Sequence, residues 1–216
     1  MTRPAACLFD LDGLLLDTEP LQARAWREAA ARFGVALSEE QLMELRGRRR
    51  LDCALQVLAW IREMGGPPVA GEELLALRQP IAEALLGGAR PMPGAPELVR
   101  RCREQAIPMA IATSSSREAV ERKARPHPWL AQIRERVHGD DPELQEGKPA
   151  PDVYLLAARR LGVDSRDCWA FEDSPAGAQA ALAAGCRVHV LVPAEMPLGA
   201  YPENVTMLTS LEQVQL

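Results

Sequence analysis

Polar side chains that could hold a cation and a phosphate follow three short apolar stretches of the chain. These side chains are Asp10 and Asp12, then Thr113 and Ser114, then Glu172 and Asp173. Lys148 lies in a Gly-Lys-Pro loop just before a predicted helix, from where it could reach the same place. Carboxylate oxygens suit Mg²⁺, which keeps several waters or substrate phosphate oxygens in its coordination shell. Backbone amides at a helix start after Thr113 would favour an anion. The pattern predicts phosphoryl transfer at a Mg²⁺ site.

A parallel sheet is the structure that would bring these side chains together. Apolar stretches predict strands at residues 5–9, 107–112, 168–171 and 188–192, with weaker candidates at 133–138 and 205–208. Helical patterns alternate with them at 97–105, 151–161 and from 175 to 184, and Ser115 with Glu118 has the spacing of a capping box. Alternating strands and helices predict an α/β fold, a Rossmann-like doubly wound parallel sheet. Its strands end at one edge, where ligands bind.

A block of helices interrupts this pattern after the first strand. Residues 18–33 have helical spacing, Ser38 with Gln41 predicts a capped second helix, and a third follows from Leu51. A fourth, at 72–86, is expected to bend or break at Pro80. No strand is predicted between 18 and 87. We therefore expect a catalytic core of residues 1–17 and 88–216 and an all-helical cap domain of residues 18–87.

Composition excludes several classes of protein. The net charge of -5 over 216 residues argues against a nucleic-acid surface. No apolar run approaches the roughly 18 residues of a membrane span, and Asp10 and Asp12 interrupt what could have been a secretory signal. The five cysteines are scattered without a CxxC pair, which predicts buried, reduced thiols. We expect a cytoplasmic protein, a monomer, with a small phosphate ester as its partner. Only two of its 25 basic residues are lysines, Lys123 and Lys148.

Four segments carry a resemblance to a known family. FDLDGLLLDTE, AIATSS, GKPAPDVY and FEDSPAGAQAALAAG are similar to the four ordered motifs of the haloacid dehalogenase superfamily, in the subgroup with a small helical cap after the first core strand. The resemblance covers nearly the whole chain. It implies a Rossmann-like core with a mobile cap, and phosphoryl transfer through an aspartyl-phosphate.

The resemblance also implies a role for each motif residue. Asp10 would be the nucleophile that attacks phosphorus, and Asp12 would be the acid that protonates the leaving oxygen and then the base that activates water. Thr113 and the backbone of Ser114 would hold the phosphoryl oxygens, while Lys148 would balance the charge on the nucleophile and on the phosphoryl group. Such a balance is needed because a carboxylate and a phosphate dianion repel each other.

The Mg²⁺ ligands follow from the same resemblance. Asp10, the carbonyl of Asp12 and Asp173 would hold the ion, with Glu172 in support.

The resemblance narrows the reaction to phosphate esters. Dehalogenases of the superfamily lack an acid at the position of Asp12, and phosphonate hydrolases need a cap lysine, which residues 18–90 do not contain. A β-phosphoglucomutase is the main alternative, because residues 45–55 resemble its cap and Arg50 stands at a substrate-contacting position. That mutase has a histidine where this chain has Gln22, which cannot do the same protonation-linked work.

Two further segments favour a phosphatase. The loop at 139–149 and the segment at 92–99 are similar to the pseudouridine-5′-phosphatase branch. We therefore expect a phosphomonoesterase for a small phosphorylated sugar or nucleoside. The arginines beside the second cap turn would either select the substrate or form a solvated basic turn; they are Arg46, Arg48, Arg49 and Arg50.

Two non-enzymatic alternatives remain in view. A phospho-acceptor receiver domain also carries acids, a threonine and a lysine at strand ends, but it is about half this length and has no helical insert. A silent sugar-phosphate binder is disfavoured because every motif residue is present.

Overall fold

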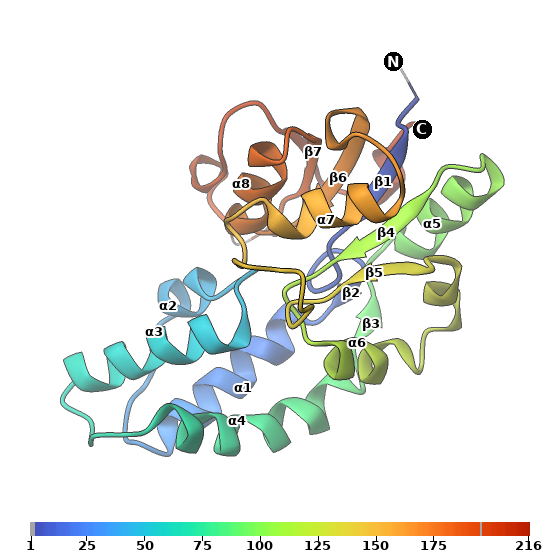
Figure 1. Ribbon diagram of the computed structural model, residues 1–216. Coiled ribbons are helices and arrows are strands. Elements are labelled where there is room, and N and C mark those ends of the chain that lie inside the picture. The colour runs from blue at the N-terminus through green and yellow to red at the C-terminus, as the bar shows by residue number, and fades with distance from the viewer. Residues whose placement is uncertain (1–2, 195) are drawn as a thin grey trace.

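The protein is built on a six-stranded parallel sheet in the order β5-β4-β1-β6-β7-β8 (Figure 1). The computed structural model describes residues 3–194 and 196–216. The strands are β1 Ala6–Phe9, β4 Met109–Ala112, β5 Glu135–Val137, β6 Cys168–Glu172, β7 Arg187–Leu191 and β8 Thr206–Leu208. The first strand of the chain therefore lies at the centre of the sheet, between β4 and β6. The predicted α/β, Rossmann-like fold is confirmed.

Helices cover both faces of the sheet, because alternate side chains of each strand point to opposite faces. Cys7 and Phe9 belong to an apolar cluster completed by α5 and α6, while Ala6 and Leu8 belong to one completed by α7 and α8. These helices are α5 Ala95–Glu104, α6 Arg117–Ala124, α7 Asp152–Arg160 and α8 Pro175–Ala183. Short 3₁₀ turns are η1 Pro128–Gln132, η2 Ser165–Asp167, η3 Leu198–Ala200 and η4 Leu211–Gln213. The five cysteines are buried and unbridged, as predicted.

Four helices form a separate bundle beside the carboxyl ends of the strands (Figure 1). They are α1 Glu19–Ala31, α2 Glu39–Glu44, α3 Arg50–Glu63 and α4 Gly71–Leu86. The bundle has its own apolar core, which includes Trp26, Leu42, Val57, Ile61 and Leu74. Two short antiparallel strands, β2 Leu16–Asp17 and β3 Arg90–Pro91, join the segments that lead into and out of it. We call this bundle the cap; its exact boundaries stay a prediction.

One local prediction was wrong in part, because a break at Pro80 does not occur, and a second was wrong. Helix α4 runs through Pro80 without a break; Ala76, whose carbonyl loses its N–H partner there, is exposed to water, as is Pro80. Helix α6 is capped by Ser116, whose side chain accepts a hydrogen bond from the Ala119 amide. Ser115 does not cap this helix, because its hydroxyl donates to Asp12. In contrast, the capping box at the start of α2 is present as predicted.

Among the described residues, no helix is long and apolar enough to cross a membrane.

Candidate active site

The side chains predicted to meet do so at the carboxyl ends of three adjacent strands. Asp10 directly follows β1, Thr113 directly follows β4, and Glu172 ends β6 with Asp173 next in the chain. All four are at least 96% buried. Because the order is β4-β1-β6, the Asp10 carboxylate lies between the other two strand ends.

Lys148 links Asp10 to Glu172. Its ammonium donates a hydrogen bond to Asp10 Oδ1 at 2.6 Å and another to Glu172 Oε1. The Tyr154 hydroxyl donates to the same Glu172 oxygen at 2.5 Å. Burial raises the pKa of Asp10 to about 8, and the nearby Glu172 and Asp12 add to this although Lys148 opposes it. One lysine therefore does not compensate the negative charge at this strand end.

Asp10, Glu172 and Asp173 form an acidic cluster whose ligand atoms all lie within 4.8 Å of one another. Asp173 Oδ2 is buried and has no hydrogen-bond partner among the described residues. Burial, together with Glu19, Glu172 and Asp10, raises the pKa of Asp173 well above its usual value. Burial likewise raises the pKa of Glu19 to about 7. An orphaned buried carboxylate oxygen among further acids is a donor set that fits a hard divalent cation.

Two glycines make room for this cluster. Gly13 has a positive φ of 84°, and a Cβ there would lie 2.1 Å from Asp173 Oδ2. A Cβ on Gly177 would lie 2.0 Å from the carboxyl carbon of Glu172. Any side chain at either position would push a carboxylate out of the cluster, so both positions require glycine.

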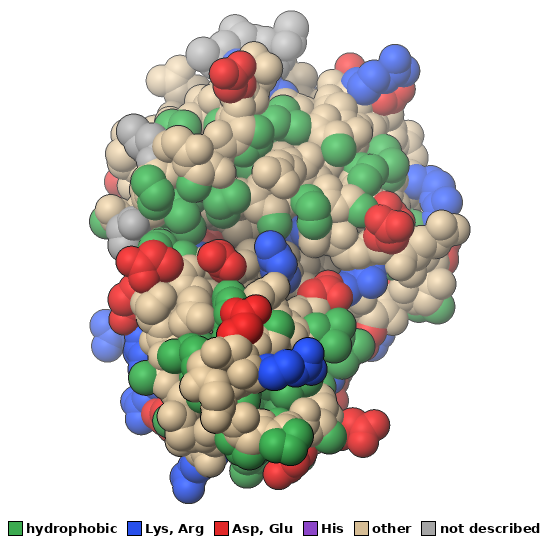
Figure 2. Space-filling view, turned by 90° about the vertical axis from the view of Figure 1, so that its left-hand side faces the viewer, with side chains coloured by type: hydrophobic (Ala, Val, Ile, Leu, Met, Phe, Trp, Pro, Cys, Tyr) green, Lys and Arg blue, Asp and Glu red, His purple; other side chains and the backbone are tan. Residues whose placement is uncertain are grey.

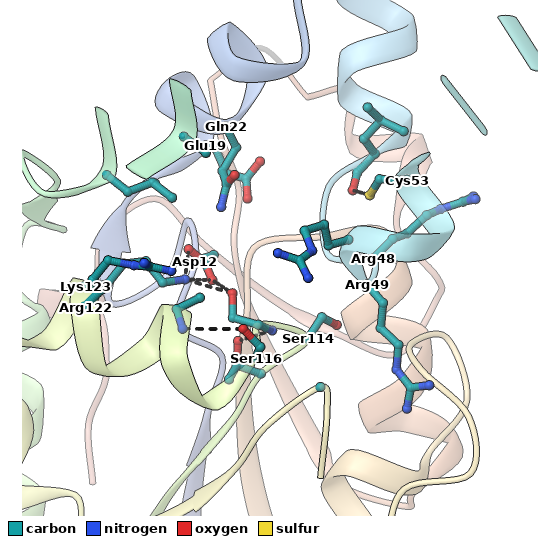
Figure 3. A pocket seen from close by; sticks show the side chains of 18 of the residues that line it. Asp12, Glu19, Gln22, Arg48, Arg49, Cys53, Ser114, Ser116, Arg122 and Lys123 are labelled. Atoms are coloured by element: carbon teal, nitrogen blue, oxygen red, sulfur yellow. Dashed lines mark hydrogen bonds and ion pairs between the residues drawn. The ribbon is translucent and has the colours of Figure 1, made fainter. Parts of the chain in front are cut away.

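Asp12 is held by a different set of partners, which the sequence did not single out (Figure 3). Thr18 Oγ1 donates to Asp12 Oδ1 at 2.7 Å, and Ser115 Oγ donates to Oδ2 at 2.8 Å. Lys123 Nζ donates to Oδ1 at 2.6 Å and forms an ion pair with Oδ2. Burial alone would raise the pKa of Asp12, but Lys123 and the two hydroxyls outweigh it and lower that pKa. The scarcity of lysine was the signal that could have pointed to Lys123.

A cavity of about 510 Å³ lies between the sheet edge and the cap. Figure 2 shows acidic and basic side chains facing each other along this junction. Six predicted site residues line it, four from the core and two from the cap: Asp10, Asp12, Thr113, Ser114, Gln22 and Arg50. Asp10 and Asp12 are at its floor. Lys148, Glu172 and Asp173 lie next to Asp10 but do not line the cavity.

The cap wall of the cavity carries a buried arginine that the sequence did not reveal. Arg78 of α4 is 6% exposed, and its guanidinium lies 4.3 Å from the centre of the Trp26 ring. It donates a hydrogen bond to Gln22 Oε1, which fixes the amide of Gln22 at the cavity wall. Arg50 instead donates to Gln79 at 2.6 Å and is exposed at the rim.

The turn between α2 and α3 closes against the core. Ser114 Oγ donates to the carbonyl of Gly47 at 2.8 Å. Gly47 has a φ of 74°, and a Cβ there would lie 2.1 Å from Ser174 Oγ. The Arg49 side chain packs against Gly147, next to Lys148. The cap therefore covers the strand ends in this structure, which separates the cavity from bulk water on that side.

Comparison with known proteins agrees with the sequence motifs. A family model described as haloacid dehalogenase-like hydrolase matches residues 4–185. The chain is 38% identical over 191 residues to a probable pseudouridine-5′-phosphatase of Drosophila melanogaster, covering 87% of this chain and 80% of that protein. It is 35% identical over 191 residues to (DL)-glycerol-3-phosphatase 1, mitochondrial, of Arabidopsis thaliana, covering 86% of this chain but only 63% of that relative's length.

A solved structure matches nearly the whole chain. The crystal structure of CbbY from Rhodobacter sphaeroides in complex with phosphate has a TM-score of 0.80 and 28% sequence identity. The match covers 98% of this chain and 96% of the other. The sheet, the cap and their arrangement are therefore shared with that protein.

Proposed function

The chain belongs to the haloacid dehalogenase-like hydrolase family, and we propose that it hydrolyses a small phosphorylated sugar or nucleoside in a Mg²⁺-dependent reaction through an aspartyl-phosphate. Phosphatases stand among its relatives, and it is a phosphoric monoester hydrolase. The metal, the intermediate and the substrate belong to the proposal.

The observation that carries the proposal is the pairing of Asp10 and Asp12 with two separate lysines at one cavity floor. Lys148 contacts Asp10 at 2.6 Å, and Lys123 contacts Asp12 at the same distance. Two carboxylates only two residues apart are thus in different environments, which is what two different chemical roles require.

In the proposed reaction Asp10 attacks phosphorus, and the bond from phosphorus to the ester oxygen breaks. In the free protein Lys123 favours the ionised form of Asp12, so Asp12 must carry a proton when the ester is bound. It gives this proton to the ester oxygen, which leaves as an alcohol. Asp12 then takes a proton from water as the water attacks the phosphorus of the aspartyl-phosphate, and inorganic phosphate and the Asp10 carboxylate are released. Splitting one displacement into two lowers the barrier of each, and the Lys148 ammonium limits repulsion between Asp10 and the phosphate.

Asp10, the Asp12 carbonyl and Asp173 would hold Mg²⁺, with Glu172 in support. The bound ion supplies positive charge at the phosphoryl oxygens. The orphaned Asp173 Oδ2 and the raised pKa values of Asp10 and Asp173 support this placement.

The proposed substrate class rests on the size and lining of the cavity. A volume of about 510 Å³ is within the range of about 300–1,000 Å³ for small-molecule sites. The Gln22 amide and the Arg78 guanidinium offer hydrogen-bond donors to hydroxyl groups, and Trp26 and Leu42 offer apolar surface. The names of the relatives, which refer to glycerol phosphate and pseudouridine phosphate, point to substrates of this size.

The test is a phosphate-release assay with Mg²⁺ over phosphorylated metabolites, including glycerol 3-phosphate, fructose 1-phosphate and pseudouridine 5′-phosphate. We expect release from at least one of them. β-Glucose 1-phosphate is assayed for both products: free phosphate supports the phosphatase, whereas glucose 6-phosphate without free phosphate would mean a mutase. No release from any ester would refute the proposal.

Gly13→Ala is expected to weaken Mg²⁺ activation. The new Cβ would force Asp173 out of the acidic cluster, and displaced metal-site partners typically cost about 10- to 100-fold in metal affinity. The Mg²⁺ concentration for half-maximal activity measures this effect.

Gly34→Ala is the matched control for this change. Gly34 has a similar φ of 76°, but a Cβ there meets nothing within 4 Å. Both variants therefore carry the same backbone strain, roughly 1–2 kcal/mol, and only Gly13→Ala should shift the Mg²⁺ requirement. Equal Mg²⁺ curves for the two variants would contradict the placement of the metal beside Asp173.

A further inference from the structure

Lys123 is a charged side chain placed where a helix normally packs an apolar one. It comes from α6 and lies one turn after Val120, which belongs to the apolar cluster under the sheet. Lys123 is 1% exposed. Removing an ammonium from water costs several kcal/mol, which is offset only by well-placed partners. The partners of Lys123 are therefore the reason for its position.

Those partners are Asp12 and the hydroxyl next to it. Lys123 Nζ lies 2.6 Å from Asp12 Oδ1 and pairs also with Oδ2. The same nitrogen donates to Ser115 Oγ at 2.8 Å, and that hydroxyl donates to Asp12 Oδ2 at 2.8 Å. Lys123 thus reaches the carboxylate directly, along the dashed lines between Lys123 and Asp12 in Figure 3, and also through Ser115.

The contacts fix how the carboxylate is turned. Thr18, the residue before α1, donates to Oδ1 at 2.7 Å, while Ser115 donates to Oδ2. Lys123 contacts both oxygens from α6. A carboxylate held from three separate segments loses its freedom to rotate about the bond to Cβ, so its two oxygens keep their directions relative to the cavity.

We propose that Lys123 is a positioning residue that orients Asp12 for proton transfer at the ester oxygen and at the attacking water. This inference rests on the proposed function, because it assigns Lys123 to the two proton transfers of that reaction. In the first, the proton moves from Asp12 to the leaving oxygen as the bond from phosphorus to that oxygen breaks. In the second, a water proton moves to Asp12 as the water oxygen bonds to phosphorus and Asp10 is released.

Lys123→Met tests the inference with two esters. Glycerol 3-phosphate has an alkoxide leaving group that needs a proton, whereas p-nitrophenyl phosphate releases a stable phenolate that needs none. On glycerol 3-phosphate we expect kcat to fall about 100-fold or more, the usual size of a general acid–base contribution, with KM within about threefold of wild type.

On p-nitrophenyl phosphate the variant is expected to behave differently. The first step proceeds without a proton, but water activation still depends on Asp12, so the aspartyl-phosphate accumulates. A burst of p-nitrophenolate and a phosphorylated protein after acid quench are the expected readouts. If Lys123 had a role in folding alone, its loss would lower kcat equally on both esters, and no phosphorylated protein would be trapped.

Three companion variants keep the result interpretable. Lys123→Arg retains the charge and is expected to recover part of the loss. Ser115→Ala removes one contact without removing the charge and should give a smaller loss with the same dependence on leaving group. Arg117→Met removes an exposed cation from the same helix and should leave kcat unchanged.

The outcomes separate this inference from the proposed function. If wild-type protein releases no phosphate from glycerol 3-phosphate, the best alkyl ester of the panel takes its place, and the proposed function fails only if no ester is hydrolysed. The positioning role is overturned by either of two results with an active wild type. In one, kcat of Lys123→Met on glycerol 3-phosphate is within about threefold of the wild-type value; in the other, kcat falls equally on both esters and no burst is seen. If circular dichroism shows that Lys123→Met does not fold, Ser115→Ala becomes the deciding variant. A fall in its kcat that is the same for both esters would then overturn the inference.

Discussion

Asp10→Asn is expected to abolish phosphate release, with kcat lowered by at least about 10⁴-fold, as for the loss of a catalytic nucleophile in other enzymes. An amide does not attack phosphorus, so the aspartyl-phosphate cannot form. Asparagine has the shape of aspartate, and its carbonyl oxygen still accepts a hydrogen bond from Lys148. The assay is release of inorganic phosphate from the best ester of the panel, with acid-quenched protein analysed for the phosphoryl adduct.

Asp17→Asn is the matched control for this substitution. Asp17 belongs to the same segment but is exposed, so the same chemical change there should leave kcat unchanged. Circular dichroism and thermal melting show whether both variants keep the fold. Wild-type turnover by Asp10→Asn, or a phosphoryl adduct that still forms in it, would exclude Asp10 as the nucleophile.

Mg²⁺ is expected to stabilise the protein more at pH 8 than at pH 5. In the metal-free protein, burial raises the pKa of Asp10 from 3.8 to about 8 and that of Glu19 from 4.5 to about 7. The folded chain therefore binds more protons than the unfolded chain over this window, and its free energy of unfolding falls as pH rises through it. A bound cation offsets the same negative charge. The increase in Tm on adding Mg²⁺ should accordingly grow with pH up to about 8.

The measurement is a set of thermal melts in EDTA and in excess Mg²⁺ at several pH values. His138 and His189, whose pKa values burial lowers, contribute alike with and without metal, so they cancel in the difference between the two melts. Asp173→Asn, which removes one proposed ligand, should show a much smaller Mg²⁺ effect. A Mg²⁺-induced increase in Tm that shrinks towards pH 8, or that is absent, would contradict the cation site.

The parallel sheet followed from local pattern, because apolar runs that end in polar residues are typical of buried parallel strands. The pattern could not show that α4 passes through Pro80, since this depends on the neighbouring carbonyl facing water. It also could not show β2 and β3: two-residue strands have no periodicity and exist only because Leu16 and Pro91 meet where the chain enters and leaves the cap.

The motif residues of the site were predictable because each lies at the end of a strand or next to one. Arg78 was not predictable, and the scarcity of lysine was the one signal for Lys123, because each belongs to a helix whose sequence looks amphipathic and ordinary. What makes them part of the site is the packing of α6 and α4 against Asp12 and Gln22, segments 111 and 56 residues away in the chain. Contacts at such separation are set by tertiary structure and leave no local signal.

The scarcity of lysine has a practical consequence for following the opening of the molecule. The chain has two lysines, and both are at least 97% buried: Lys123 lines the cavity, and Lys148 lies behind Asp10. A protease specific for lysine can therefore cut at two places, the bond between Lys148 and Pro149 and, within α6, the bond between Lys123 and Ala124. Cleavage after Lys123 requires α6 to detach from Asp12, a local opening rather than a surface event. The rate of cleavage at Lys123 in limited proteolysis therefore reports how often α6 detaches from Asp12, and the measurement needs no label or mutation.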